Sequence, residues 1–260
     1  MKLSNEDLIK FRNKHGTSFY IFDKNKFISN FLNYRDTFCS LYPKIEIAYA
    51  YKANYMPILG DIMNNYNGMI EVVSGLEYNI ALQSIDAKRI IYNGPVKTKE
   101  NLYHALKQGT IVNIDSLYEI KYIKELLNEG KITEACIGIR INFKVLHYIS
   151  RFGFDIENGE LDRVLKSLNQ DKRIKVVSIH SHFSTKEKSL EIFLIRTKQM
   201  CDVYKKLHVD HPIKYLNIGG GFFGHKGGAD FPRAKFHLST ETTADVRFDN
   251  PHVVFPHAKC

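Results

Sequence analysis

The stretch Ile45-Glu46-Ile47-Ala48-Tyr49-Ala50-Tyr51-Lys52-Ala53-Asn54 is an apolar run that ends in a polar loop. The same pattern recurs along the chain, where apolar runs typical of strands alternate with segments of helical periodicity. This alternation predicts βα units and a parallel sheet. The length of 260 residues suits a single α/β barrel, which needs roughly 250 residues.

Seven strands with informative loops behind them are expected. They cover residues 45–51, 69–73, 89–92, 110–114, 135–141, 175–180 and 214–218, with helices between them such as 99–108, 116–128, 160–169 and 189–207. An eighth strand is expected at 252–255. The predicted fold is therefore an α/β protein with a TIM-like (β/α)8 barrel, incomplete if that last strand fails to form, and an open doubly wound sheet is the alternative.

The chain divides into three expected segments. Residues 1–24 hold a helix at 5–14 and a strand at 18–22, and residues 25–224 hold the barrel. The tail, residues 225–260, is atypical because isoleucine is absent after Ile218 while Gly, Pro, His and Thr increase.

Composition excludes several classes of function. The net charge of +9 comes with lysines spread over the whole chain, so a nucleic-acid partner is not expected. No apolar run is long enough to span a bilayer, and the polar start lacks the core of a signal peptide. We expect a cytoplasmic protein without a membrane partner.

Lys52 stands where the first barrel strand runs into its loop. A lysine amine at such a place can be kept neutral by its surroundings and condense with an aldehyde. Most lysines at strand ends serve solubility instead, so the position alone does not decide between the two roles.

Gly219, Gly220 and Gly221 directly follow the strand at 214–218. Three glycines let the backbone approach an anion closely and present its N–H groups, as phosphate cradles late in a barrel do. A flexible turn is the plainer interpretation, and the apolar strand before the triplet favours the cradle.

His180 and His182 end another strand and share one face of it, because alternate residues of a strand point the same way. Two histidines can ligate zinc, but no third ligand is visible nearby. We therefore expect no metal and favour histidines that pack in the core or stack on a ring.

Three further charged residues are candidates for the site. Glu71 and Glu77 flank Ser74-Gly75, where a carboxylate could face Lys52, although Glu77 also suits the first turn of a helix. Arg140 lies inside an apolar strand, so its charge requires an anionic ligand or an internal carboxylate as a partner.

Together these motifs resemble a family. Tyr49-Ala-Tyr-Lys52-Ala-Asn54, Glu71-Val-Val-Ser-Gly75, Asn113-Ile-Asp115-Ser116, Arg140-Ile-Asn142, Ser150-Arg-Phe152-Gly153, His180-Ser-His182 and Gly219-Gly-Gly221 occur in the family's order. The chain is similar to the pyridoxal-phosphate decarboxylases of the alanine-racemase fold type, which include diaminopimelate, ornithine and biosynthetic arginine decarboxylases.

The resemblance implies a role for each candidate. Lys52 would form the internal aldimine with pyridoxal 5′-phosphate, and His182 would stack on the pyridine ring. Thr185 and the glycines 219–221 would hold the phosphate. Arg140 would lie beside the cofactor, and Glu71 and Glu77 near Lys52. The implied reaction is loss of the α-carboxylate of an amino acid, with the cofactor as electron sink.

The chain departs from the family in two places. Phe183-Ser184-Thr185-Lys186 stands where diaminopimelate decarboxylases have Ile-Gly-Ser-Gln, which leaves the amino-acid substrate open. Phe255-Pro256-His257-Ala258 is the nearest counterpart of Glu-Pro-Gly-Arg, so Phe255 would replace the glutamate that protonates the pyridine nitrogen.

The family's C-terminal β-domain, which supplies a cysteine and a tyrosine across a homodimer, is expected to be missing. The expected function is decarboxylation of diaminopimelate or of a basic amino acid such as ornithine, lysine or arginine. The alternatives are a cofactor-binding or regulatory protein without turnover, an inactive truncated fragment, and an amino-acid racemase of the same fold.

Overall fold

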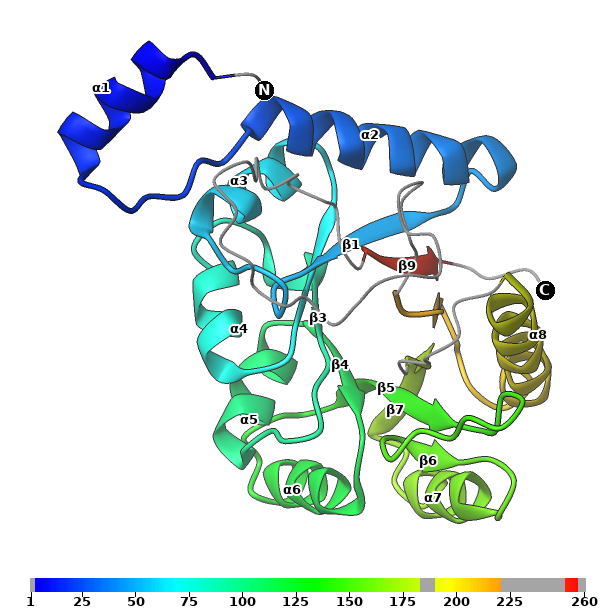
Figure 1. The fold of residues 1–260 in the computed structure, drawn as a ribbon. Coiled ribbons are helices and arrows are strands. Elements are labelled where there is room, and N and C mark those ends of the chain that lie inside the picture. The colour runs from blue at the N-terminus through cyan, green and yellow to red at the C-terminus, as the bar shows by residue number, and fades with distance from the viewer. Residues whose placement is uncertain (1–2, 183–189, 221–250, 257–260) are drawn as a thin grey trace.

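The computed structural model describes residues 3–182, 190–220 and 251–256, and these form a curled sheet wrapped by helices (Figure 1). The strands are β1 (Glu46–Ala50), β2 (Met69–Val72), β3 (Ile90–Tyr92), β4 (Ile111–Ile114), β5 (Ala135–Asn142), β6 (Phe154–Asp155), β7 (Ile174–His180), β8 (Tyr215–Asn217) and β9 (Pro251–Pro256). Each strand predicted for the barrel is present, with ends within one or two residues of those expected.

Helices connect the strands and lie on the outside of the sheet. They are α1 (Asn5–His15), α2 (Lys24–Leu41), α3 (Pro57–Asn65), α4 (Gly75–Ala81), η1 (Ala87–Arg89), α5 (Lys99–Lys107), α6 (Leu117–Asn128), α7 (Glu160–Asn169) and α8 (Leu190–Leu207). Polar side chains start several of them, since Ser74 and Thr98 each accept a hydrogen bond from a backbone N–H of the first turn.

The strands pair into a ring. From β1 to β2, β3, β4, β5, β7 and β8 every neighbouring pair is parallel, which is the arrangement that the βα alternation predicts. β9 lies between β8 and β1 and is antiparallel to both. The expected strand at 252–255 is thus confirmed, but it does not have the direction of the eighth strand of a (β/α)8 barrel.

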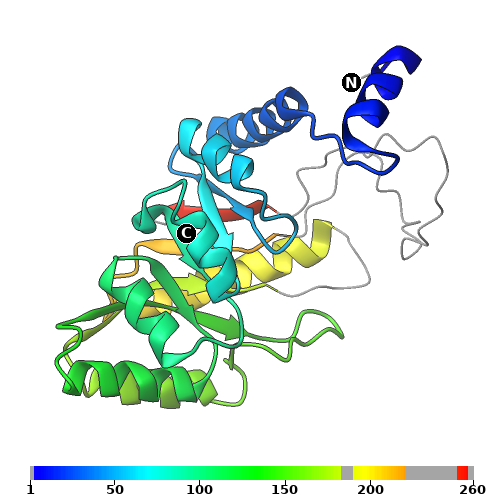
Figure 2. The ribbon, with the colours of Figure 1, turned by 90° about the vertical axis from the view of Figure 1, so that its left-hand side faces the viewer.

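The N-terminal segment differs from the prediction. The expected helix is present as α1, but the strand expected at 18–22 is wrong, because residues 16–23 run as an irregular connection into α2. No strand of the described chain pairs with this connection, so its backbone gains no ladder of hydrogen bonds. Figures 1 and 2 show α1 standing away from the barrel, and none of its residues is buried.

Side chains on the two faces of the strands have different roles. Odd-numbered residues of β1 such as Ile47 and Tyr49 pack outward, and Tyr49 meets Phe27 of α2 with ring centroids 5.3 Å apart. Ala48, Met69, Ile91 and Ile111 point inward and form a small apolar layer within the barrel, with Tyr215 packed against it. The helix-facing core is therefore separate from a thin inner layer.

Two residues further along β2, β3 and β4, the inward face becomes polar. Glu71 follows Met69, Asn93 follows Ile91, and Asn113 follows Ile111, and all three polar side chains are buried. The parallel strands end on this side, so the fold gathers their polar ends in one place. Within the described ranges, none of the helices combines the length and apolar character that crossing a bilayer requires.

Candidate functional site

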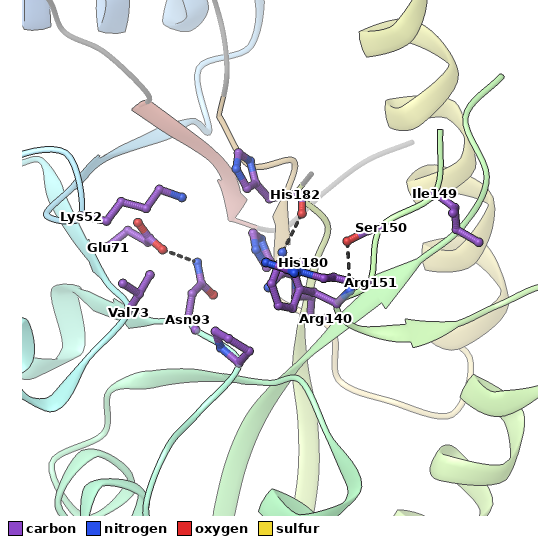
Figure 3. A pocket seen from close by; sticks show the side chains of 13 residues that line it. Lys52, Glu71, Val73, Asn93, Arg140, Ile149, Ser150, Arg151, His180 and His182 are labelled. Atoms are coloured by element: carbon purple, nitrogen blue, oxygen red, sulfur yellow. Dashed lines mark hydrogen bonds between the residues drawn. The ribbon is translucent and has the colours of Figure 1, made fainter. Parts of the chain in front are cut away.

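A cavity of about 450 Å³ opens above this polar layer, at the carboxyl ends of the strands (Figure 3). Its lining comes from the last residues of β2, β5 and β7 and from the loops after β1, β2, β3, β5 and β7. The lining residues are Lys52, Glu71, Val73, Asn93, Gly94, Pro95, Arg140, Ile149, Ser150, Arg151, Phe152, His180 and His182. Five residues of the predicted site, or of the motif around it, therefore share one cavity: Lys52, Glu71, Arg140, His180 and His182.

Lys52 is placed by the turn that ends β1. The amide of Tyr51 donates to the carbonyl of Glu71 at 2.8 Å, which continues the sheet, and the amide of Ala53 donates to the carbonyl of Ala50 at 3.1 Å. The backbone of Lys52 is thereby held at the rim of the barrel. Its side chain is exposed and extends into the cavity beside Glu71 (Figure 3).

Glu71 is buried at the base of the cavity and belongs to a chain of polar side chains. Its Oε1 accepts from Nδ2 of Asn93 at 3.0 Å, and Oδ1 of Asn93 accepts from Nδ2 of Asn113 at 2.7 Å. Burial raises the pKa of Glu71, and the nearby positive charge of Lys52 opposes that shift. The site therefore holds a carboxylate that takes up a proton more readily than an exposed glutamate does.

Glu77 does not line the cavity. Its Oε2 accepts from the amide of Val73 at 2.8 Å, while its own amide donates to Oγ of Ser74 at 3.3 Å, so the side chain closes the first turn of α4. Burial raises its pKa, and the charges of Glu71 and Lys52 also act on it. Glu77 thus stabilises the loop after β2 through hydrogen bonds. Contact of Glu77 with a ligand stays a prediction.

The buried guanidinium of Arg140 forms an ion pair with an internal carboxylate, that of Asp115. Nη1 of Arg140 donates to Oδ2 of Asp115 at 2.7 Å, and Nη2 donates to the carbonyl of His182 at 2.7 Å. Asp115 also accepts from the amide of Gly153 at 2.8 Å through its other oxygen. The guanidinium lies over the ring of Phe152 with 4.9 Å to the centroid, so three contacts fix Arg140.

His182 is oriented by the glycine turn. The amide of Gly220 donates to Nδ1 of His182 at 3.2 Å, which places the proton of the neutral ring on Nε2. Gly219 has φ of +71°, and a Cβ there would lie 2.7 Å from the carbonyl oxygen of Ser181 and 2.8 Å from Cβ of His182. Only glycine fits between the turn and the histidine.

Part of the predicted phosphate site lies outside the described residues. Thr185 and Gly221 belong to ranges that the structure does not describe, as does the side chain of Phe255. Gly219 and Gly220 are described, and the amide of Gly219 donates to Oδ1 of Asn217 at 2.9 Å. Their closeness to His182 is established, while contact with a phosphate stays a prediction.

The residues present fit pyridoxal 5′-phosphate. An accessible lysine amine, a buried carboxylate and a fixed guanidinium share a cavity with an imidazole, and a turn that tolerates no side chain packs against that imidazole. This set offers an amine for an aldehyde, positive charge for an anion and a flat face for a ring. Among the described residues, no three His, Cys, Asp or Glu side chains cluster as a metal ion would require.

Two residues of the site have roles that the sequence did not reveal. Asn93 follows a strand in an Asn-Gly pair, which reads as a turn, although its two-residue spacing from Ile91 places it on the inner face. Asp115 belongs to a quoted motif, but no pattern identified it as the partner of Arg140. The spacing of polar residues at successive strand ends was the available signal for both.

The chain is similar to known proteins over most of its length. Residues 25–249 match the family model of the pyridoxal-dependent decarboxylases, pyridoxal binding domain. The diaminopimelate decarboxylase of Bacillus subtilis is 27% identical over 239 residues, which make up 85% of this chain and 54% of that protein. The diaminopimelate decarboxylase of Aquifex aeolicus is 30% identical over 220 residues, or 79% of this chain and 50% of that protein.

A solved structure shares the fold. The diaminopimelate decarboxylase of M. jannaschii in complex with L-lysine superposes with a TM-score of 0.67 at 26% identity, covering 80% of this chain and 52% of that one. The chain thus spans about half the length of these relatives.

Proposed function

Because the chain belongs to the pyridoxal-dependent decarboxylases, we propose that it binds pyridoxal 5′-phosphate over Lys52 and removes the α-carboxylate of an amino acid. The observation that carries this proposal is the meeting of Lys52, Glu71, Arg140 and His182 in one cavity. The volume, about 450 Å³, falls within the range of small-molecule sites, roughly 300–1,000 Å³.

When bound, the cofactor supplies an aldehyde that takes an amine and a ring that accepts the electron pair left by the carboxylate. Lys52 presents its amine at the rim, and the carboxyl group of Glu71 beneath it balances a positive charge at that place. His182 offers a ring whose orientation Gly220 fixes. Arg140 is held at the ligand's place by its ion pair with Asp115.

The substrate that we propose is diaminopimelate or a basic amino acid such as ornithine, lysine or arginine. The named activities of the relatives support this class. The cavity wall contributes Ser150 and Arg151, and the guanidinium of Arg151 suits a carboxylate of such a molecule. A cytoplasmic location stays a prediction.

We propose further that a second copy of the chain covers the mouth of the cavity. Leu76, Val96, Leu117 and Ile149 follow four successive strands on this side of the barrel, and each is at least 60% exposed. Exposed apolar side chains on one side of a barrel are typical of an interaction surface, and Ile149 also lines the cavity. Sedimentation of the purified protein tests this point, and a monomer at micromolar concentration with cofactor present would contradict it.

The function itself is tested by carbon dioxide release. Purified protein with pyridoxal 5′-phosphate is incubated with diaminopimelate, ornithine, lysine or arginine, and Lys52→Ala is the control. We expect release from one substrate that Lys52→Ala abolishes. A visible absorbance band that depends on Lys52, with no carbon dioxide from any substrate, would favour a non-catalytic cofactor-binding protein, and inversion of the α-carbon in the same mixture would favour a racemase.

A further inference from the structure

A buried ion pair lies behind one wall of the cavity. Nζ of Lys97 is 2.6 Å from Oε1 of Glu119, and both side chains are 0% exposed. Lys97 follows β3, and Glu119 lies in the first turn of α6. Neither residue lines the cavity.

Lys97 and Glu119 form hydrogen bonds with two loops of the site. Nζ of Lys97 donates to the carbonyl of Gly94 at 2.7 Å, and Gly94 lines the cavity. Gly94 has φ of +95°, and a Cβ there would clash with the backbone of Val73, so the turn lies close against the end of β2 and admits no side chain. The hydrogen bond from Lys97 closes the loop after β3 on itself at this place.

Glu119 fixes the neighbouring loop. Its Oε2 accepts from the amide of Asp115 at 2.6 Å and from the amide of Ser116 at 3.1 Å. The carboxylate of Asp115 in turn holds Arg140 and the amide of Gly153. A continuous path of hydrogen bonds thus runs from Lys97 through Glu119 and Asp115 to the guanidinium in the cavity.

Stability is a weak explanation for such a pair. Removing two charges from water costs several kcal/mol per ion, and the attraction between them often does no more than offset that cost. The neighbouring Lys99 pairs with Glu125 and Glu129 at the surface, where the desolvation cost is small. What distinguishes Lys97 and Glu119 is the number of site-forming backbone groups that they hold.

We propose that Lys97 and Glu119 are positioning residues: they fix the loops after β3 and β4 and so set the place at which Asp115 holds Arg140 in the cofactor site. This inference rests on the proposed function, because the geometry that the pair sets is that of the cofactor site. Lys97 and Glu119 act through the loops and touch no ligand themselves.

The test uses Lys97→Met and Glu119→Gln in the full chain. Glu119→Gln keeps the shape and an acceptor for the amides of Asp115 and Ser116, so it perturbs folding least and decides the matter if Lys97→Met does not fold. Lys99→Met is the matched control, since it removes a lysine ion pair from the start of the next helix. Pyridoxal 5′-phosphate is titrated by absorbance well below the melting temperature of each variant.

A second measurement needs no cofactor. Amide hydrogen exchange at Gly153, whose N–H donates to Asp115, reports whether the carboxylate has moved in the cofactor-free protein. We expect both variants to raise the Kd for pyridoxal 5′-phosphate about tenfold or more and to speed exchange at Gly153. The control should stay within about twofold of the wild type in both measurements.

A lower melting temperature with an unchanged Kd and unchanged exchange at Gly153 in both variants would overturn the inference, because the pair would then serve stability alone. Failure of the proposed function looks different. In that case the wild-type protein itself shows no absorbance band with pyridoxal 5′-phosphate, whatever the variants do.

Discussion

Removal of the negative charge that faces Arg140 is expected to destabilise the protein strongly. In Asp115→Asn the side chain keeps its size, but the guanidinium 2.7 Å away loses its counter-charge. The side chains of Arg140 and Asp115 are only 9% and 5% exposed, so water cannot replace the lost partner.

The magnitude follows from the contacts. Breaking a buried pair by removing one partner costs about 3–5 kcal/mol, because a charge is left uncompensated. Arg140 and Gly153 donate to different oxygens of Asp115, and asparagine keeps an oxygen at one of these two places. One of the two hydrogen bonds is therefore retained, and we expect a loss near the lower end, about 3 kcal/mol. The free energy of unfolding is measured by urea denaturation of the cofactor-free protein.

A surface pair provides the control. Asp162 accepts from Lys206 at 2.8 Å, but the two side chains are 60% and 65% exposed. Asp162→Asn should therefore cost at most about 1 kcal/mol. If Asp115→Asn lost no more than this control, the view that Asp115 neutralises and fixes Arg140 would be refuted.

Two further predictions concern the cavity. Gly219→Ala brings a Cβ within 2.8 Å of His182 and forces a positive φ on alanine, which costs about 1–2 kcal/mol in the backbone alone; we expect weaker binding of pyridoxal 5′-phosphate, and an unchanged Kd would contradict the close packing. The second prediction concerns how the stability of Glu71→Gln, relative to the wild type, depends on pH. Burial raises the pKa of Glu71 above its ordinary value of 4.5, so the stability gained from its protonation is present below that pH and is lost as pH rises through the folded pKa. The variant has no such loss, so its stability relative to the wild type should increase with pH, whereas a constant difference in urea denaturation between about pH 4 and pH 8 would count against the shift.

The barrel was largely readable from the sequence, because each strand is an apolar run bounded by turn residues and each crossover helix has its own period. The strand predicted at 18–22 does not form. Hydrophobic periodicity indicates which side chains can be buried, but it does not indicate whether a partner strand exists. The antiparallel direction of β9 could not be predicted from the sequence for a related reason. A period of two is the same in either direction, and only the neighbouring strands decide it.

The candidate site was partly readable. Lys52, Glu71 and His182 lie at the ends of different strands, and parallel strands bring such residues to one rim. The buried charge of Arg140 required a partner, but the sequence could not select Asp115 over other carboxylates, because that choice depends on how the loops after β4 and β5 pack. Glu77 lies in the first turn of α4, the place that the sequence had allowed beside a role near Lys52, and its carboxylate accepts from the amide of Val73.

The central claim is that Lys52 anchors the cofactor, and reductive trapping tests it most directly. The protein is incubated with pyridoxal 5′-phosphate, reduced with borohydride and digested, and the labelled peptide is identified by mass spectrometry. We predict a single phosphopyridoxyl group, on Lys52, that is absent from Lys52→Ala. A label spread over other lysines of this lysine-rich chain, or retained in the variant, would contradict the account.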